Sequence, residues 1–218
     1  MKDLENILNV IAKRYPLKEL GSKGFDGMKV SGMTFSINSF NAKGLGHVST
    51  MCAHGFLGLM KMDTLIINPS EVDLPLLSYD RIHVMGKDKL IAEIYNTMLN
   101  DRPIPELAKF NQEYSKFLAP ATVAKNWYDG IRMSDECVAL VGKKTENSAF
   151  DKMILDYVDA YLSAPADVVT DIDAKKARNN VYISGLLDNG GVATDLFIKR
   201  YGRETTSMFF KEVLFSHS

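Results

Sequence analysis

Apolar residues recur along the chain with two different periods, and the change of period separates a central strand-rich region from helical flanks. Residues 3–14 carry apolar side chains at helical spacing behind Asp3, a good capping residue, which predicts an amphipathic helix. Over residues 28–67 the period shortens to two, which predicts consecutive strands. Residues 81–95 alternate on both sides of a turn predicted at 86–89, and they form the clearest hairpin of the sequence.

Helical spacing returns after residue 100. It predicts helices at 105–117, 150–162, 171–187 and 194–214, with a short strand at 138–141. Short turns between consecutive strands imply an antiparallel sheet, and helices from both ends of the chain are available to cover its two faces. The predicted fold class is therefore α/β, a three-layer α/β/α sandwich with a central antiparallel sheet, formed by residues 1–218 as a single domain.

Composition and charge narrow the class of protein. Of the 218 residues, 46% are hydrophobic and 24% are charged, which is ordinary for a globular protein with a proper core. With 26 basic and 27 acidic side chains the net charge is −1, so no overall field attracts nucleic acid. The two cysteines, Cys52 and Cys137, are too few for a disulfide framework, which is typical of a reducing compartment. We therefore expect a cytoplasmic protein.

Membrane and standard catalytic motifs are not visible in the sequence. It has no run of about 18 apolar residues that could span a bilayer, and its first residues lack the apolar core of a signal peptide. It has no dinucleotide-binding glycine motif, no Walker motif and no nucleophile elbow. The four histidines have no carboxylate companion at ligand spacing, so we expect no metal site. Neither a membrane nor nucleic acid is expected as a partner.

Asp80 is the chemically most distinctive residue, because it follows the apolar run Leu74-Pro75-Leu76-Leu77 just where a strand is predicted to begin. A carboxyl group in such surroundings is poorly solvated, so its pKa should be raised and its proton available near neutral pH. The plainer alternative is that Asp80 closes a loop in an Asx-turn. Several of the eleven methionines lie near the predicted sheet, which suits either core filling or a pocket for a large flat ligand.

Three passages together resemble one known family. They are residues 74–80, the hairpin at 80–95 with the preceding strand at 65–69, and the C-terminal passage from Tyr201-Gly202 to Phe215. In order and spacing these passages resemble the ferredoxin-dependent bilin reductases, which reduce open-chain tetrapyrroles such as biliverdin with electrons from ferredoxin. The resemblance implies an α/β/α sandwich with an antiparallel sheet, in agreement with the pattern of apolar residues.

The resemblance also implies site residues. Asp80 falls on the family's central Asp, which bonds the pyrrole nitrogens of the bilin and supplies protons. Asp188 falls near a second family Asp, located between the last two helices. Thr64 takes the place of a His, and Cys52 lies close to the place of a Glu, in the member that converts biliverdin to phycocyanobilin. That member's specific reaction is therefore not implied.

The substrate implied by the resemblance is a bilin, whose conjugated system itself accepts single electrons, so no bound cofactor is expected beside ferredoxin or a similar one-electron donor. We expect Asp80 to line a cavity on the order of several hundred Å³. Thr64, Met62, Tyr79 and His83 are the expected substrate contacts, although His83 could instead be an edge histidine in contact with solvent.

Two other functions stay open at this point. One is a tetrapyrrole-binding protein that keeps the pocket without catalysis. The other is a relative of the reductase that acts on degraded-chlorophyll catabolites.

Overall fold

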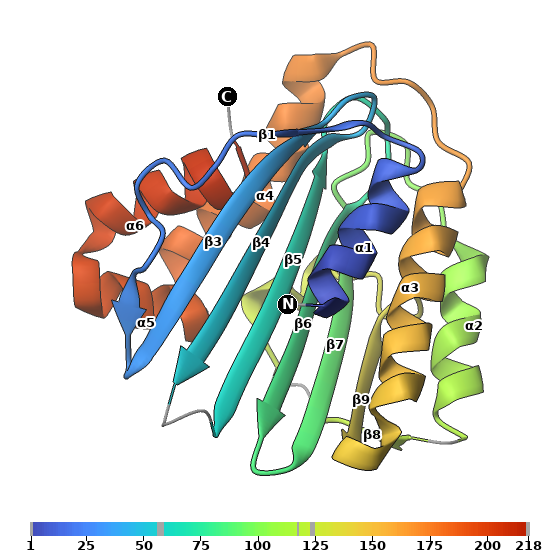
Figure 1. Ribbon diagram of the computed structural model, residues 1–218. Coiled ribbons are helices and arrows are strands. Elements are labelled where there is room, and N and C mark those ends of the chain that lie inside the picture. Colours follow the sequence, from blue (N-terminus) through green and yellow to red (C-terminus); the bar gives the residue numbers. More distant parts are fainter. Residues whose placement is uncertain (1, 56–58, 117, 123–124, 217–218) are drawn as a thin grey trace.

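A computed structural model of the chain describes residues 2–55, 59–116, 118–122 and 125–216. Its described part is built on one sheet of nine strands in the order β1-β3-β4-β5-β6-β7-β9-β8, with β2 paired to the outer edge of β3 (Figure 1). All strand pairs are antiparallel. The strands are β1 (Leu17–Glu19), β2 (Lys29–Val30), β3 (Met33–Ala42), β4 (Gly46–Gly55), β5 (Met60–Pro69), β6 (Leu76–Val84), β7 (Lys87–Tyr95), β8 (Ala119–Pro120) and β9 (Val138–Lys143).

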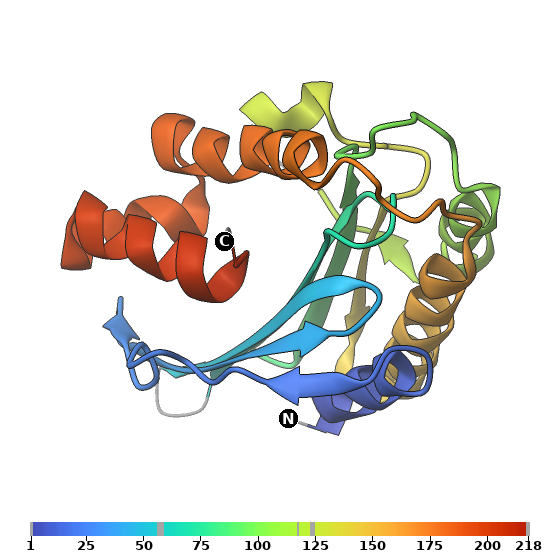
Figure 2. The same ribbon diagram turned by 90° about the horizontal axis from the view of Figure 1, so that it is seen from above.

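Helices cover both faces of this sheet, and the view from above separates the three layers (Figure 2). The first face carries α1 (Lys2–Ala12), α2 (Pro105–Tyr114) and α3 (Asn147–Ser163). The second face carries α4 (Ile172–Asn189), α5 (Val192–Tyr201), α6 (Arg203–Phe209) and the π-helical turn Phe210–Leu214. Short 3-10 turns lie at Trp127–Gly130 and Lys144–Glu146. The predicted α/β/α sandwich with a central antiparallel sheet is confirmed.

Alternation along the strands produces two apolar cores. Leu65 and Ile67 of β5 are fully buried against α1–α3, whereas Ile66 points to the other face and packs with Phe197 and Phe209 of the C-terminal helices. Because successive side chains of a strand point to opposite faces, one continuous apolar run can serve both cores. The parity of a residue number within a strand therefore decides which core, and which site, that residue can join.

The hairpin β6–β7 is tighter than predicted. Its turn consists of Met85 and Gly86, both with positive φ (50° and 79°), so the turn predicted at 86–89 is wrong. Two consecutive residues with positive φ are typical of the two-residue turns that match the twist of a hairpin. Strand β6 also begins earlier than expected, at Leu76, so Asp80 lies within the strand and does not open it.

The helix predicted at 194–214 is interrupted. Gly202 has φ 81° and separates α5 from α6, and α6 then passes directly into the π-helical turn. A left-handed residue of this kind ends a helix at little cost only when it is glycine. The interruption lets α5 and α6 pack beside each other on the second face of the sheet (Figure 1).

Three side chains of the sheet hold the end of the C-terminal segment. His47 Nε2–H donates to the carbonyl of Val213, Ser49 Oγ to that of Leu214, and Asn68 Nδ2 to that of Phe215, each at 2.7 Å. The last carbonyls of a helix have no partner within the helix, so these bonds satisfy groups that burial would otherwise leave unpaired. We call these three bonds the carbonyl ladder; it fixes the C-terminal segment to β4 and β5.

Candidate functional site

Asp80 projects from β6 toward the second face of the sheet, the one covered by α4–α6. It pairs with Thr64 of β5, whose neighbours Met62 and Ile66 pack on the same side against the C-terminal helices. Thr64 Oγ1 donates a hydrogen bond of 2.5 Å to Asp80 Oδ1. The side chains of Met62 and Asp80 are only half-buried, so this part of the second face is not sealed by the helices.

The environment of Asp80 suits proton transfer. The pKa of its carboxyl group is raised to about 6, mainly by burial; the hydrogen bond from Thr64 lowers the pKa, and the negative charge of Glu93 adds a smaller upward effect. A group with a pKa near 6 takes up and releases its proton close to neutral pH, as a general acid requires. The sequence-based expectation for Asp80, a raised pKa, agrees with this geometry.

A second carboxylate, Glu93 of β7, shares this face, and the sequence interpretation overlooked it. Glu93 lies directly opposite Ser78, two residues from Asp80 on the same strand. Tyr95 donates its hydroxyl hydrogen to one oxygen of Glu93 at 2.6 Å, and Arg132 binds the other at 3.0 Å. The alternation of side chains along the hairpin could have revealed Glu93 in the sequence. Both the predicted and the observed turn place Glu93 on the same face of the sheet as Asp80.

Aromatic side chains border the two carboxylates. Tyr95 stacks on Tyr182 of α4 with ring centroids 4.2 Å apart, and Tyr128 meets both rings edge-on. Trp127 completes the group, with its indole N–H donating to the carbonyl of Gly190 at 3.0 Å. We call these four residues the aromatic wall. It joins the end of β7, the 3-10 turn and α4, and gives the Asp80 face an aromatic boundary.

Two of the four expected substrate contacts, Tyr79 and His83, lie on the opposite face. Tyr79 is fully buried in the core beneath α1–α3, and His83 Nδ1 lies 2.6 Å from Asp88 Oδ1. Their odd numbers place both on the side of β6 that Asp80 does not share, because adjacent side chains alternate. The expectation that they border the same ligand as Asp80 is therefore corrected, whereas Thr64 and Met62 do share its face.

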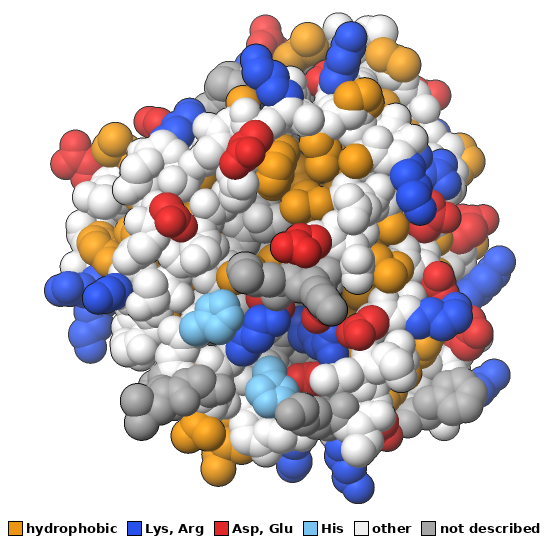
Figure 3. Space-filling model, viewed as in Figure 1, with side chains coloured by type: hydrophobic (Ala, Val, Ile, Leu, Met, Phe, Trp, Pro, Cys, Tyr) orange, Lys and Arg blue, Asp and Glu red, His pale blue; other side chains and the backbone are white. Residues whose placement is uncertain are grey.

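His83 belongs instead to an ion-pair network. Arg81 binds Asp88 at 3.0 Å and Asp3 at 2.8 Å, and it also pairs with Asp151. The network joins α1 and α3 to the sheet. It lies on the first face, where the register also aligns His83 with Lys61, and Figure 3 shows histidine and basic side chains gathered there beside acidic ones.

Asp188, the second expected catalytic residue, points into solvent. It lies in the last turn of α4, its side chain is 63% exposed, and it pairs with Arg203 at the start of α6. The residues of α4 that meet the sheet are Tyr182, Ile183 and Leu186, on the other side of the helix. The structure therefore does not bring Asp188 to the Asp80 face, and this expectation is corrected.

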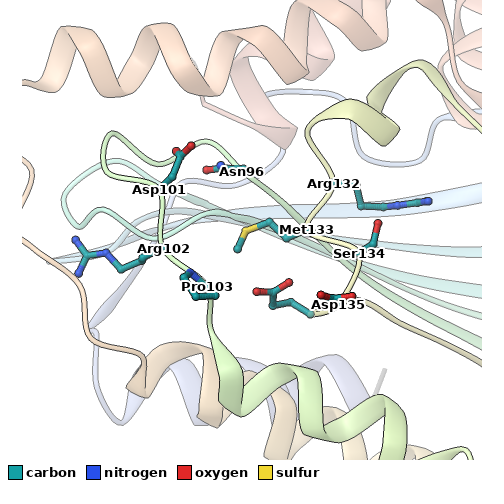
Figure 4. Close-up of a pocket in the computed structure, with 9 residues that line it drawn as sticks. Asn96, Asp101, Arg102, Pro103, Arg132, Met133, Ser134 and Asp135 are labelled. Carbon is teal, nitrogen blue, oxygen red and sulfur yellow. The ribbon is translucent and has the colours of Figure 1, made fainter.

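Two cavities lie elsewhere. The larger, about 420 Å³, is bounded by Asn96, Arg102, Arg132 and Glu136 among others (Figure 4). Arg132 therefore both borders this cavity and binds Glu93. The smaller, about 360 Å³, lies beside the carbonyl ladder, where His47 and Asn68 contribute to its wall. Asp80 lines neither of them, so the expected cavity beside Asp80 stays a prediction.

Within residues 2–55, 59–116, 118–122 and 125–216, no three His, Cys, Asp or Glu side chains converge as the ligands of a metal ion would. None of the helices in these ranges combines the length and the apolar character needed to cross a bilayer.

The chain is similar in structure to known proteins, although not in sequence. No protein-family model matches the chain, and no curated protein matches its sequence. Among solved structures, phytochromobilin synthase from tomato, in complex with biliverdin, superposes with a TM-score of 0.76 over 99% of this chain and 82% of that chain. The two sequences are 13% identical in this comparison, so the likeness concerns the fold. The chain therefore has the fold of phytochromobilin synthase.

Proposed function

We propose that this chain binds an open-chain tetrapyrrole of the biliverdin type against the Asp80 face and reduces it. The electrons come one at a time from reduced ferredoxin or a similar small donor, and no bound cofactor is needed. The proposal is supported by the likeness in fold to a protein whose structure holds biliverdin, a likeness that extends over nearly all of this chain. It is also supported by the aromatic wall beside a half-buried acid.

The single observation that carries the proposal is the state of Asp80. Its pKa of about 6 keeps part of the carboxyl population protonated at neutral pH, on a partly open face of the sheet. A reduced tetrapyrrole is more basic than its oxidised form, so it takes the proton from Asp80 when an electron arrives. Asp80 becomes a carboxylate, and the Thr64 hydroxyl, already donating to Oδ1, stabilises that charge.

A second candidate function is a tetrapyrrole-binding protein without catalysis. Residues beside Asp80 favour this alternative: Thr64 and Met51, paired with each other across β4 and β5, carry no group that exchanges a proton near neutral pH. A single acid that must supply every proton would make turnover slow or absent. The two functions share the ligand and differ only in what happens when electrons are supplied.

The test combines a ligand titration with an anaerobic reduction. Asp80→Asn keeps the shape of the side chain and one hydrogen bond but cannot deliver a proton. We expect it to bind biliverdin within about tenfold of the wild-type Kd, because apolar and aromatic contacts dominate such sites. Turnover with reduced ferredoxin, followed by the absorption spectrum, should fall by roughly 10², the usual effect of losing a general acid. Asp188→Asn, an exposed carboxylate on α4, is the matched control and should turn over normally.

The outcomes separate the alternatives. Binding of biliverdin by the wild-type chain with no spectral change after reduced ferredoxin is added would establish the non-catalytic alternative. No binding at all would remove both functions. Turnover of Asp80→Asn at the wild-type rate would show that the proton comes from another group.

A further inference from the structure

Glu93 and Asp80 form a diagonal cross-strand pair. Asp80 is directly opposite Ile91, and Glu93 is directly opposite Ser78, so the two carboxyl groups stand on neighbouring strands, on the same face, offset by two residues. Side chains in this diagonal relation lie within reach of each other. Both also lie close enough to the hydroxyl of Tyr182 on α4 to act on its pKa, which burial raises strongly.

Glu93 is held in one place by two donors. Tyr95 donates to one of its oxygens at 2.6 Å and Arg132 to the other at 3.0 Å, and its side chain is 13% exposed. Arg132 is itself fixed by Asp129 at 3.1 Å. Tyr95 is fixed by stacking on Tyr182. Two donors of this kind bind the ionised form of a carboxylate, so Glu93 presents a fixed negative charge to the Asp80 side of the sheet.

We propose that Glu93 is a positioning residue of the Asp80 site: held as a carboxylate by Tyr95 and Arg132, it keeps Asp80 protonated until a ligand takes the proton. The inference rests on the proposed function for its role in turnover. The coupling between the two carboxyl groups, in contrast, is a property of the free protein. The inference adds to the site a residue, Glu93, that makes no hydrogen bond to Asp80.

Among the groups around Asp80, Glu93 is the one whose charge raises the pKa of Asp80, in addition to the larger effect of burial. Thr64 of β5 and Tyr182 of α4 are uncharged at neutral pH, and Arg132 is bonded to Glu93. The negative charge of Glu93 adds to burial in raising the pKa of Asp80. When Asp80 gives up its proton, two carboxylates stand side by side, and their repulsion favours renewed protonation of Asp80 from solvent.

Two substitutions with opposite expected effects test the inference in the free protein. The carbonyl stretching band of protonated Asp80, identified by its loss in Asp80→Asn, is followed by infrared difference spectroscopy from pH 4 to pH 8. Glu93→Gln removes the negative charge, so the midpoint should fall by about one pH unit. Arg132→Gln removes the charge that offsets Glu93, so the midpoint should rise. A merely structural role would not produce shifts of opposite sign.

Two further variants complete the set. Glu93→Asp keeps the charge and should leave the midpoint near the wild-type value. Glu113→Gln, an exposed residue of α2 on the other side of the sheet, is the matched control and should not move it. If Glu93→Gln does not fold, the rise expected for Arg132→Gln still decides the question, and an unmoved midpoint in that variant would overturn the inference.

Turnover separates this inference from the proposed function. With biliverdin and reduced ferredoxin, the rate should decline as the pH rises through the Asp80 midpoint, and Glu93→Gln should move that decline to lower pH. If the infrared midpoint shifts in opposite directions in the two variants but the protein reduces no biliverdin, the coupling is supported and the proposed function is wrong. Midpoints unmoved in Glu93→Gln and Arg132→Gln, with turnover still abolished in Asp80→Asn, would overturn the inference and leave the function standing.

Discussion

Gly185 lies on the side of α4 that meets the aromatic wall, and it leaves room for the indole of Trp127. A Cβ atom built at Gly185 would come within 2.1 Å of that ring. Alanine in the middle of a helix is favourable by about 1 kcal/mol relative to glycine, yet forcing a ring out of a packed position costs about 1–3 kcal/mol. Packing, and not intrinsic helix propensity, therefore decides whether the substitution raises or lowers the stability of the protein.

We expect Gly185→Ala to lower the free energy of unfolding by up to about 2 kcal/mol, the balance of these two effects. Gly130→Ala is the control, because a Cβ there meets nothing within 4 Å. Urea denaturation followed by far-UV circular dichroism measures both variants. Since the chain has one tryptophan, its emission reports whether the indole has moved. Equal stability of the two variants, with unchanged emission, would contradict the close packing described for Trp127.

The site residues that could be predicted from the sequence depended on whether a residue occupies an odd or an even position in its strand. Asp80 could be found because the apolar run before it predicted a poorly solvated carboxyl group. Tyr79 and His83 were chosen for their nearness to Asp80 along the chain, although alternation separates odd from even positions across the sheet. The orientation of Asp188 depends on which side of α4 meets the sheet, and a helix with apolar residues on more than one side does not reveal that in advance.

At the scale of elements, long strands were predictable and short ones were not. Strands β4 and β5 lie within and at the end of the region 28–67 that the sequence predicts as consecutive strands, because ten alternating or apolar positions make an unambiguous signal. Strands β1 and β8 have three and two residues, too few to show a period, and β2, which begins the predicted strand region, has only two. They form because β3 and β9 offer free edges to pair with, which is a tertiary cause.

The carbonyl ladder makes the docking of the C-terminal segment sensitive to pH. Burial lowers the pKa of His47 to about 4, so its ring is neutral in the folded protein and its Nε2–H donates to Val213. In the unfolded chain the pKa is 6.5. Between these values the unfolded chain binds the extra proton, so the stability contributed by His47 is complete above pH 6.5 and is lost as the pH falls toward 4.

We expect His47→Gln to remove this pH dependence, because its amide can still donate to the carbonyl but does not titrate. The unfolding free energy of the wild type minus that of the variant should fall by about 3 kcal/mol from pH 7 to pH 4. Urea denaturation at three pH values measures it. Taking the difference cancels Asp80, whose raised pKa acts in the opposite direction, favouring the folded state as the pH falls. A constant difference would mean that His47 is charged, or accessible, in the folded protein.

At the scale of the whole molecule, the two ends of the chain are joined through one sheet. Helix α1 packs against α3 on the first face, while the last turn of the chain bonds to β4 and β5 on the second. We therefore predict a single cooperative unit, as the sequence suggested. Urea unfolding curves recorded by far-UV and near-UV circular dichroism should superimpose. Two separated transitions would indicate that the helices of one face unfold on their own.

The covering of β3 has a consequence for how copies of this protein behave toward one another. An uncovered outer strand offers unpaired amides and carbonyls on which another chain can add a strand and begin to aggregate. Here the outer edge of β3 is occupied by β1 and β2, and between them Leu20 donates its amide hydrogen to the carbonyl of Ser39 while the amide of Ile37 donates to the side chain of Asp26. At the opposite edge β8 has two residues, and Pro120 has no amide hydrogen to offer. The wide sheet that carries the Asp80 face is thereby protected from edge-to-edge association.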